Sequence, residues 1–190
     1  MKVLRSQAWF GGSAGEGYAL SQDDLCHLVS IAAEEAGDRL PLIAGIIVES
    51  TRDAIQRGKA LAPRGVRVLQ VTPPHYIFKT GDDSMLSHFR DITEAVGIPI
   101  MIYNVIPWNY LSTPLLLRIM NEVPGVIVAL WNAVQAGDHA TALQIHNRLL
   151  NMWSLMVHPN LPACVKYVLE QQGCRVGLPR RPITLSLIHI

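Results

Sequence analysis

Four short apolar segments alternate along the chain with segments that have helical spacing. They are Pro41–Val48, Val66–Thr72, Ile98–Asn104 and Gly125–Leu130. We interpret them as strands buried on both faces, because such strands read as near-continuous apolar runs. Strands that alternate with helices predict a parallel sheet. The segment centres lie 24 to 32 residues apart, and an eight-unit (β/α) barrel repeats about every 31 residues. The spacing therefore predicts part of such a barrel.

The segments between the strands contain helix-start signals. A further strand, Ala8–Phe10, precedes a glycine-rich stretch and a helix that starts near Ser21. The other expected helices, each with its cap, cover Arg52–Leu61 (Thr51), Ser84–Ala95 (Asp82 or Asp83) and the segment up to Met120 (Ser112).

The alternation ends at Gly125–Leu130, where the apolar run passes directly into helical spacing without a loop. We expect only helices beyond it, so either the sheet stops at about five strands or a segment is missing there. The predicted fold class is α/β: an incomplete TIM (β/α)8 barrel of about five parallel strands over residues 1–128, then C-terminal helices over 129–184. Residues 185–190 resemble a translated sequencing adapter and are left out of the fold, the alternative being a short native apolar tail.

Composition narrows the classes of partner. The 190 residues suit one domain, and their net charge of +1 provides no basic field for nucleic acid or an anionic membrane. No apolar run approaches the roughly 20 residues of a membrane helix. The three cysteines are too scattered for a disulfide framework or a metal site. We expect a cytoplasmic protein with reduced thiols and no bound metal.

Three segments at expected strand ends contain polar or glycine residues. Gly11–Gly17 follows the first strand, and its backbone amides could hold a carboxylate or phosphate, although a plain tight turn explains it equally well. Tyr103 ends a strand, where a phenol could relay protons or simply pack its ring. His75 and Tyr76 follow two prolines at another strand end, and a lone histidine is more often structural.

Together these segments resemble the dihydrodipicolinate synthase and N-acetylneuraminate lyase family of pyruvate-dependent class I aldolases. That family has G-[S/T]-T-G-E at its second strand, V-T-P at its fourth and Y-N-V-P at its fifth. The matching segments here, in the same order, are Gly12-Ser-Ala-Gly-Glu16, Val71-Thr-Pro73 and Tyr103-Asn-Val-Ile-Pro107. The segment Asn160-Leu-Pro-Ala-Cys-Val-Lys166 resembles the family's C-terminal N-P-x-P-V-K helix. An ordinary open α/β sheet would not explain these motifs.

The resemblance implies a role for each matching residue. Tyr103 and Ser13 would relay protons, with His75 or Tyr76 as a third member of the relay. The turn residues Gly12, Ala14 and Gly15 would bind the pyruvate carboxylate. Because Ala14 stands where the family has a hydroxyl residue, this chain has one hydroxyl group fewer for that carboxylate. Asn109 lies in the stretch where dihydrodipicolinate synthases have a substrate-binding arginine, which suggests a different second substrate.

The family's nucleophile is a lysine in a sixth-strand G-[I/V]-K motif, but Val128-Ala-Leu stands there in this chain. The four lysines are Lys2, Lys59, Lys79 and Lys166, and we expect none of them beside Tyr103. A proton relay cannot replace the amine. The sequence thus predicts a Schiff-base lyase of pyruvate and a 2-keto acid or aldehyde that is inactive as written. The alternative is a non-catalytic barrel that binds a small carboxylic acid or a protein. The resemblance implies no cofactor, and members are usually homo-oligomers.

Overall fold

The chain is described by a computed structural model, which covers residues 8–13, 15–36, 39–75 and 79–127 and the single positions 162, 166, 170, 173 and 177. Within these residues five parallel strands form one sheet in the order β1-β2-β3-β4-β5. The prediction of a parallel α/β sheet is confirmed. The strands are β1 (Ala8–Phe10), β2 (Leu42–Ile46), β3 (Val66–Val71), β4 (Ile100–Ile102) and β5 (Val126–Ile127).

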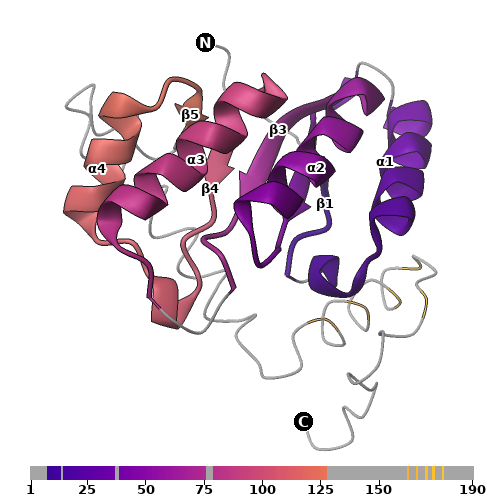
Figure 1. Ribbon diagram of the computed structural model, residues 1–190. Coiled ribbons are helices and arrows are strands. Elements are labelled where there is room, and N and C mark those ends of the chain that lie inside the picture. Colours follow the sequence, from indigo (N-terminus) through magenta and orange to yellow (C-terminus); the bar gives the residue numbers. More distant parts are fainter. Residues whose placement is uncertain are drawn as a thin grey trace, which may run out of the picture.

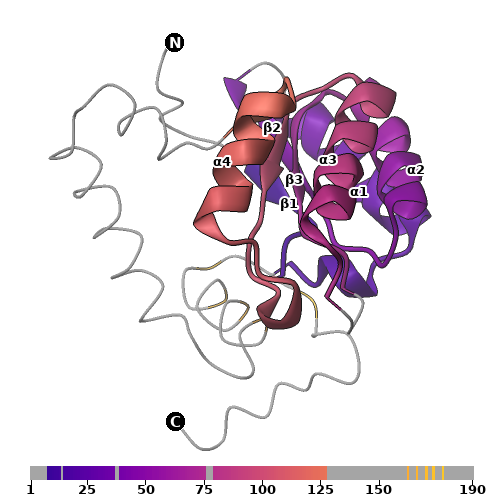
Figure 2. The ribbon, with the colours of Figure 1, turned by 60° about the vertical axis from the view of Figure 1, so that its left-hand side comes forward.

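Each of the first four strands is followed by a helix that returns the chain to the other end of the sheet, as a parallel arrangement requires. The helices stand in a row in front of the strands in Figure 1, in the same order as the strands they follow. In Figure 2, the view turned by 60°, α4 has come forward and α1, α2 and α3 lie to its right. They are α1 (Gln22–Ala36), α2 (Thr51–Leu61), α3 (Asp82–Val96) and α4 (Thr113–Glu122), with short 3-10 turns η1 (Gly17–Ala19), η3 (Ala62–Arg64) and η4 (Pro107–Asn109).

Alternate residues of each strand face the helices, because successive side chains of a strand point to opposite faces. The residues on the helix side form the core together with Phe89 of α3, which is completely buried. On the other face, Gly45 is paired with Gln70 and Gln70 with Met101. The core-facing strand residues are Ala44, Ile46, Val66, Leu69, Val71 and Ile100.

Two of the predicted helix caps are wrong. Ser50, not Thr51, caps α2, since its hydroxyl accepts a hydrogen bond from the Asp53 amide at 3.1 Å. Gly81 occupies the cap position of α3, and Asp82 and Asp83 lie in its first turn, where carboxylates face the positive end of the helix dipole. For α4 the prediction is confirmed, because the Ser112 hydroxyl accepts from the Leu115 amide at 3.4 Å.

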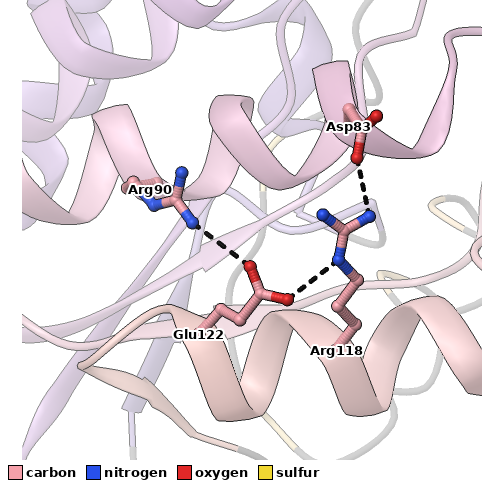
Figure 3. Close-up of polar contacts among 4 residues, drawn as sticks. All are labelled: Asp83, Arg90, Arg118 and Glu122. Carbon is pink, nitrogen blue, oxygen red and sulfur yellow. Dashed lines mark hydrogen bonds and ion pairs between the residues drawn. The ribbon is translucent and has the colours of Figure 1, made fainter.

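An exposed ionic network connects α3 to α4 (Figure 3). Arg118 contacts Asp83 at 2.6 Å and Glu122 at 2.9 Å, and Arg90 contacts the other oxygen of Glu122 at 3.5 Å. Solvent screens pairs of this kind. We therefore attribute the packing of the two helices to their buried apolar residues.

The expected C-terminal helices over 129–184 and the tail at 185–190 lie outside the described residues, except for single positions. Of these, Pro162, Lys166 and Glu170 are helical. No helix in the described part of the chain is both long and apolar enough to cross a membrane.

Candidate active site

The loops that follow the strands gather at the lower end of the sheet in Figure 1. In (β/α) barrels this carboxyl end of the strands is the active-site face. The glycine turn follows β1, His75 follows β3 and Tyr103 follows β4. The three segments selected from the sequence therefore lie along one edge of the sheet.

The glycine turn is held against β2 by close backbone contacts. A Cβ on Gly17 would lie 1.6 Å from the carbonyl oxygen of Gly11, and a Cβ on Gly45 would lie 2.3 Å from the same atom. Real Cβ atoms do not approach a backbone oxygen so closely. Gly11 also has a φ of 68°, which L side chains rarely adopt. The glycines at these three positions are thus required by the fold of the turn.

Hydrogen bonds inside the turn decide which amides can bind a ligand. The amides of Gly15 and Gly17 donate to the Gly12 carbonyl at 3.1 and 3.0 Å, and the Glu16 amide donates to the Ser13 carbonyl at 3.2 Å. The amides of Gly12 and Ser13 have no acceptor among the described residues. Within the glycine turn, the backbone amides of Gly12 and Ser13 are therefore the ones that could donate to a bound carboxylate. Ala14 lies outside the described residues.

Glu16 connects this turn to the C-terminal part of the chain. Its side chain is 6% exposed, and its Oε2 lies 2.8 Å from Nζ of Lys166, whose side chain is 19% exposed. Its φ of 55° is in the left-handed region, which favours glycine. A buried carboxylate requires a partner of opposite charge. Sequence reasoning assigned no contact to either residue, because their positions in the sequence gave no indication that they meet.

Among the lysines that the structure describes, Lys166 contacts the glycine turn, and it does so through its ion pair with Glu16. An ammonium group has no lone pair with which to attack a ketone. Lys59 lies in the last turn of α2, and Lys79 is exposed in the loop before α3. Lys2 lies outside the described residues.

Tyr103 is half-buried, and its backbone amide donates to the Val71 carbonyl at 2.8 Å, which extends the pairing of β3 with β4 beyond the strands. It comes two residues after Met101 and therefore belongs to the sheet face opposite the helices. Behind it, the side chain of Asn104 holds the loop to α4, accepting from the Leu111 amide at 2.8 Å and donating to the Leu111 carbonyl at 3.0 Å.

His75 lies in the loop that follows β3. It lines a cavity of about 400 Å³ between the N-terminal parts of α1 and α2, together with Tyr18, Glu49 and Arg57. Its ring meets the edge of the Trp108 ring, with centroids 6.1 Å apart. Its role in a relay stays a prediction, and the alternative residue Tyr76 lies outside the described residues.

Asn109 is almost completely buried and connects two loops. Its Nδ2 donates to the Pro74 carbonyl at 2.9 Å, and its Oδ1 accepts from the Thr80 amide at 3.2 Å. Both ends of the amide are therefore engaged within the protein. Binding of a substrate by Asn109 stays a prediction. Among the described residues, no cluster of histidine, cysteine, aspartate or glutamate could hold a metal ion.

The family comparison agrees with the position of these motifs. The family model described as the dihydrodipicolinate synthetase family matches residues 6–108 and 117–186. The chain belongs to this family. Its members include lyases, among them a sialic acid aldolase from Ruminococcus gnavus, of which a catalytic lysine mutant has been solved. That structure has a TM-score of 0.70 and 18% identity, and the match covers 94% of this chain and 78% of that one.

Two further relatives define the extent of the likeness. The 4-hydroxy-tetrahydrodipicolinate synthase of Bradyrhizobium diazoefficiens is 26% identical, with 91% of this chain and 78% of that protein covered. The alignment spans 233 positions but includes only 91% of the 190 residues of this chain, so about 60 positions are gaps in this chain. The crystal structure of dihydrodipicolinate synthase from Aquifex aeolicus has a TM-score of 0.73 and 20% identity, covering 95% of this chain and 82% of that one. These solved structures indicate a TIM-barrel type of fold.

Proposed function

We propose that this chain is a cytoplasmic keto-acid lyase of the aldolase type that cannot turn over as written, because it lacks the amine that forms the Schiff base. The parent reaction would join or cleave pyruvate and a 2-keto acid or aldehyde. The observation that carries the proposal is that no lysine occupies the position of the family's nucleophile. Lys166 comes to the glycine turn but pairs with Glu16, and Leu130 stands where the family's motif has its lysine.

The gap in the alignment supports an internal deletion. About 60 aligned positions of the Bradyrhizobium relative have no counterpart here, while both flanks of the chain are matched. A deletion after β5 would remove later strands of the barrel and leave the sheet with about five. We infer an incomplete barrel, and we expect the homo-oligomeric assembly of the family to be impaired.

Reductive trapping tests the missing amine. A lysine amine and the ketone of pyruvate lose water to form an imine, which borohydride reduces to a stable secondary amine. We expect no trapping of pyruvate on the unaltered chain and trapping on Leu130→Lys, as detected by mass spectrometry. Leu130→Arg is the matched control, because it adds the same charge but forms no imine under these conditions.

Two results would contradict this proposal. One is trapping on a lysine of the unaltered chain, or turnover of a 2-keto acid that Tyr103→Phe abolishes. The other is a soluble, folded Leu130→Lys variant that pyruvate and borohydride do not modify. The first result would show that the chain already has a reactive amine or is active, and the second that the missing amine after β5 does not explain its inactivity.

A second candidate is a non-catalytic protein that binds a small carboxylic acid. The observation that favours it is the glycine turn, which keeps two amides without acceptors among the described residues although the amine is missing. It predicts a cooperatively melting chain that binds pyruvate without turnover. Failure of the purified chain to fold would contradict it.

A further inference from the structure

Gln70 is a polar residue in the middle of an apolar strand. It lies in β3 between Leu69 and Val71, both completely buried in the core against the helices. Because side chains alternate along a strand, Gln70 points to the opposite face of the sheet. In a closed barrel that face is the inside. The family motifs assign no role to this residue.

The Gln70 amide lies beside the glycine turn. Its Oε1 is 3.6 Å from the position that a Cβ on Gly12 would occupy, which is ordinary van der Waals contact. The neighbour of Gln70 on β2 is Gly45, which has no side chain to come between Gln70 and the turn. The end of the Gln70 side chain thus lies against the glycine turn at Gly12.

The same residue also lies toward Tyr103. The register places Gln70 opposite Met101, and Tyr103 follows two residues later on the same face. Gln70 therefore stands between the two segments of the candidate site, the turn after β1 and the phenol after β4. A small ligand held at the turn and reaching toward Tyr103 would pass over its amide.

This amide has no hydrogen-bond partner among the described residues, although the residue is half-buried. Its N–H groups are therefore available to donate to a ligand that lies beside the glycine turn. We propose that the Gln70 side-chain amide donates a hydrogen bond to the carboxylate of a 2-keto acid bound at the Gly12 and Ser13 amides. The inference rests on the proposed keto-acid site and makes Gln70 a determinant of its preference for a carboxylate.

Isosteric variants of the full-length chain test this role. Gln70→Glu replaces the donor with a negative charge, and Gln70→Met keeps the length and removes the hydrogen bond. We expect titration calorimetry with sodium pyruvate to give about tenfold weaker binding for Gln70→Met and a larger loss for Gln70→Glu. Asn121→Asp on the exposed surface of α4 is the control, because it also changes an amide to a carboxylate and should leave the affinity for pyruvate unchanged.

Pyruvamide, the neutral amide of pyruvate, distinguishes a binding role from a structural one. Its amide can donate to a carboxylate, so Gln70→Glu should bind pyruvamide better than pyruvate, reversing the preference of the unaltered chain. Equal weakening of both ligands would overturn the assignment, as would unchanged pyruvate binding by Gln70→Glu and Gln70→Met; in both cases the keto-acid site stands. If the unaltered chain binds no pyruvate, both the proposed keto-acid site and the role of Gln70 in it are contradicted.

Discussion

His88 should make the stability of this protein depend on pH between about 6.5 and 4. The side chain belongs to α3 and is 5% exposed. Its Nδ1 lies 2.8 Å from the hydroxyl of Thr51, the first residue of α2. Burial lowers the pKa of His88 from 6.5 to about 4, although the Thr72 backbone and the charge of Asp91 act in the opposite direction. The folded state therefore holds this imidazole neutral at a pH where the unfolded chain is protonated.

The sign and the size of the effect follow from linkage. Between pH 6.5 and 4 the unfolded state binds a proton that the folded state does not, so the free energy of unfolding falls as the pH falls. With a folded pKa of about 4, the loss is about 2 kcal/mol at pH 5 and about 3 kcal/mol at pH 4. Above pH 6.5 the contribution is constant. A loss of this size is a large part of the stability of an ordinary domain.

Urea denaturation at pH 7, 5 and 4 measures this loss, which should lower the midpoint by roughly 1 M. Other groups titrate in the same range, so the comparison is with His88→Gln, which can bond to Thr51 but carries no titrating ring. The unaltered chain should lose more stability than His88→Gln on acidification, whereas His27→Gln, at an exposed position of α1, should behave like the unaltered chain. A pH-independent difference between the unaltered chain and His88→Gln would refute the reasoning.

Three further predictions concern the site and the surface. Gly45→Ala should destabilise the fold by about 3 kcal/mol or more and abolish pyruvate binding, because its Cβ would meet a backbone oxygen, while Gly81→Ala, with nothing within 4 Å, should change the urea midpoint little. Lys166→Met should lower the free energy of unfolding by about 3 kcal/mol, because it leaves the more deeply buried Glu16 without this partner. Glu16→Gln should lower it less, and an equal loss for the two variants in urea titrations would argue against the ion pair. Arg118→Ala should leave the thermal midpoint nearly unchanged at low and high salt, and a clear drop would show that the surface network matters.

The parallel sheet was predictable because the strands are short apolar runs with helical segments between them. The strand ends were less predictable: Pro41–Val48 contains the five-residue strand Leu42–Ile46, because apolar residues continue into the buried loop that follows it. The α2 cap was missed by one residue, since Ser50 and Thr51 are both good cap residues and only the backbone geometry distinguishes them.

In the candidate site, the positions of the glycine turn and Tyr103 at strand ends followed from the motifs. The interactions between distant segments did not. Nothing in the local sequence indicates that Gln70 lies against Gly12, or that the amide of Asn109 joins two loops instead of facing a ligand. Such interactions depend on sheet register and on loop paths, which the local pattern of residues does not determine.

The ion pair between Glu16 and Lys166 joins positions 150 residues apart in the sequence. During synthesis the first strands can pair long before the lysine leaves the ribosome, so the carboxylate waits without this counter-ion while much of the sheet assembles. Closing so long a loop is also slow compared with forming neighbouring strand–helix units. The turn that would receive the ligand is therefore among the last parts of the molecule to reach its final form.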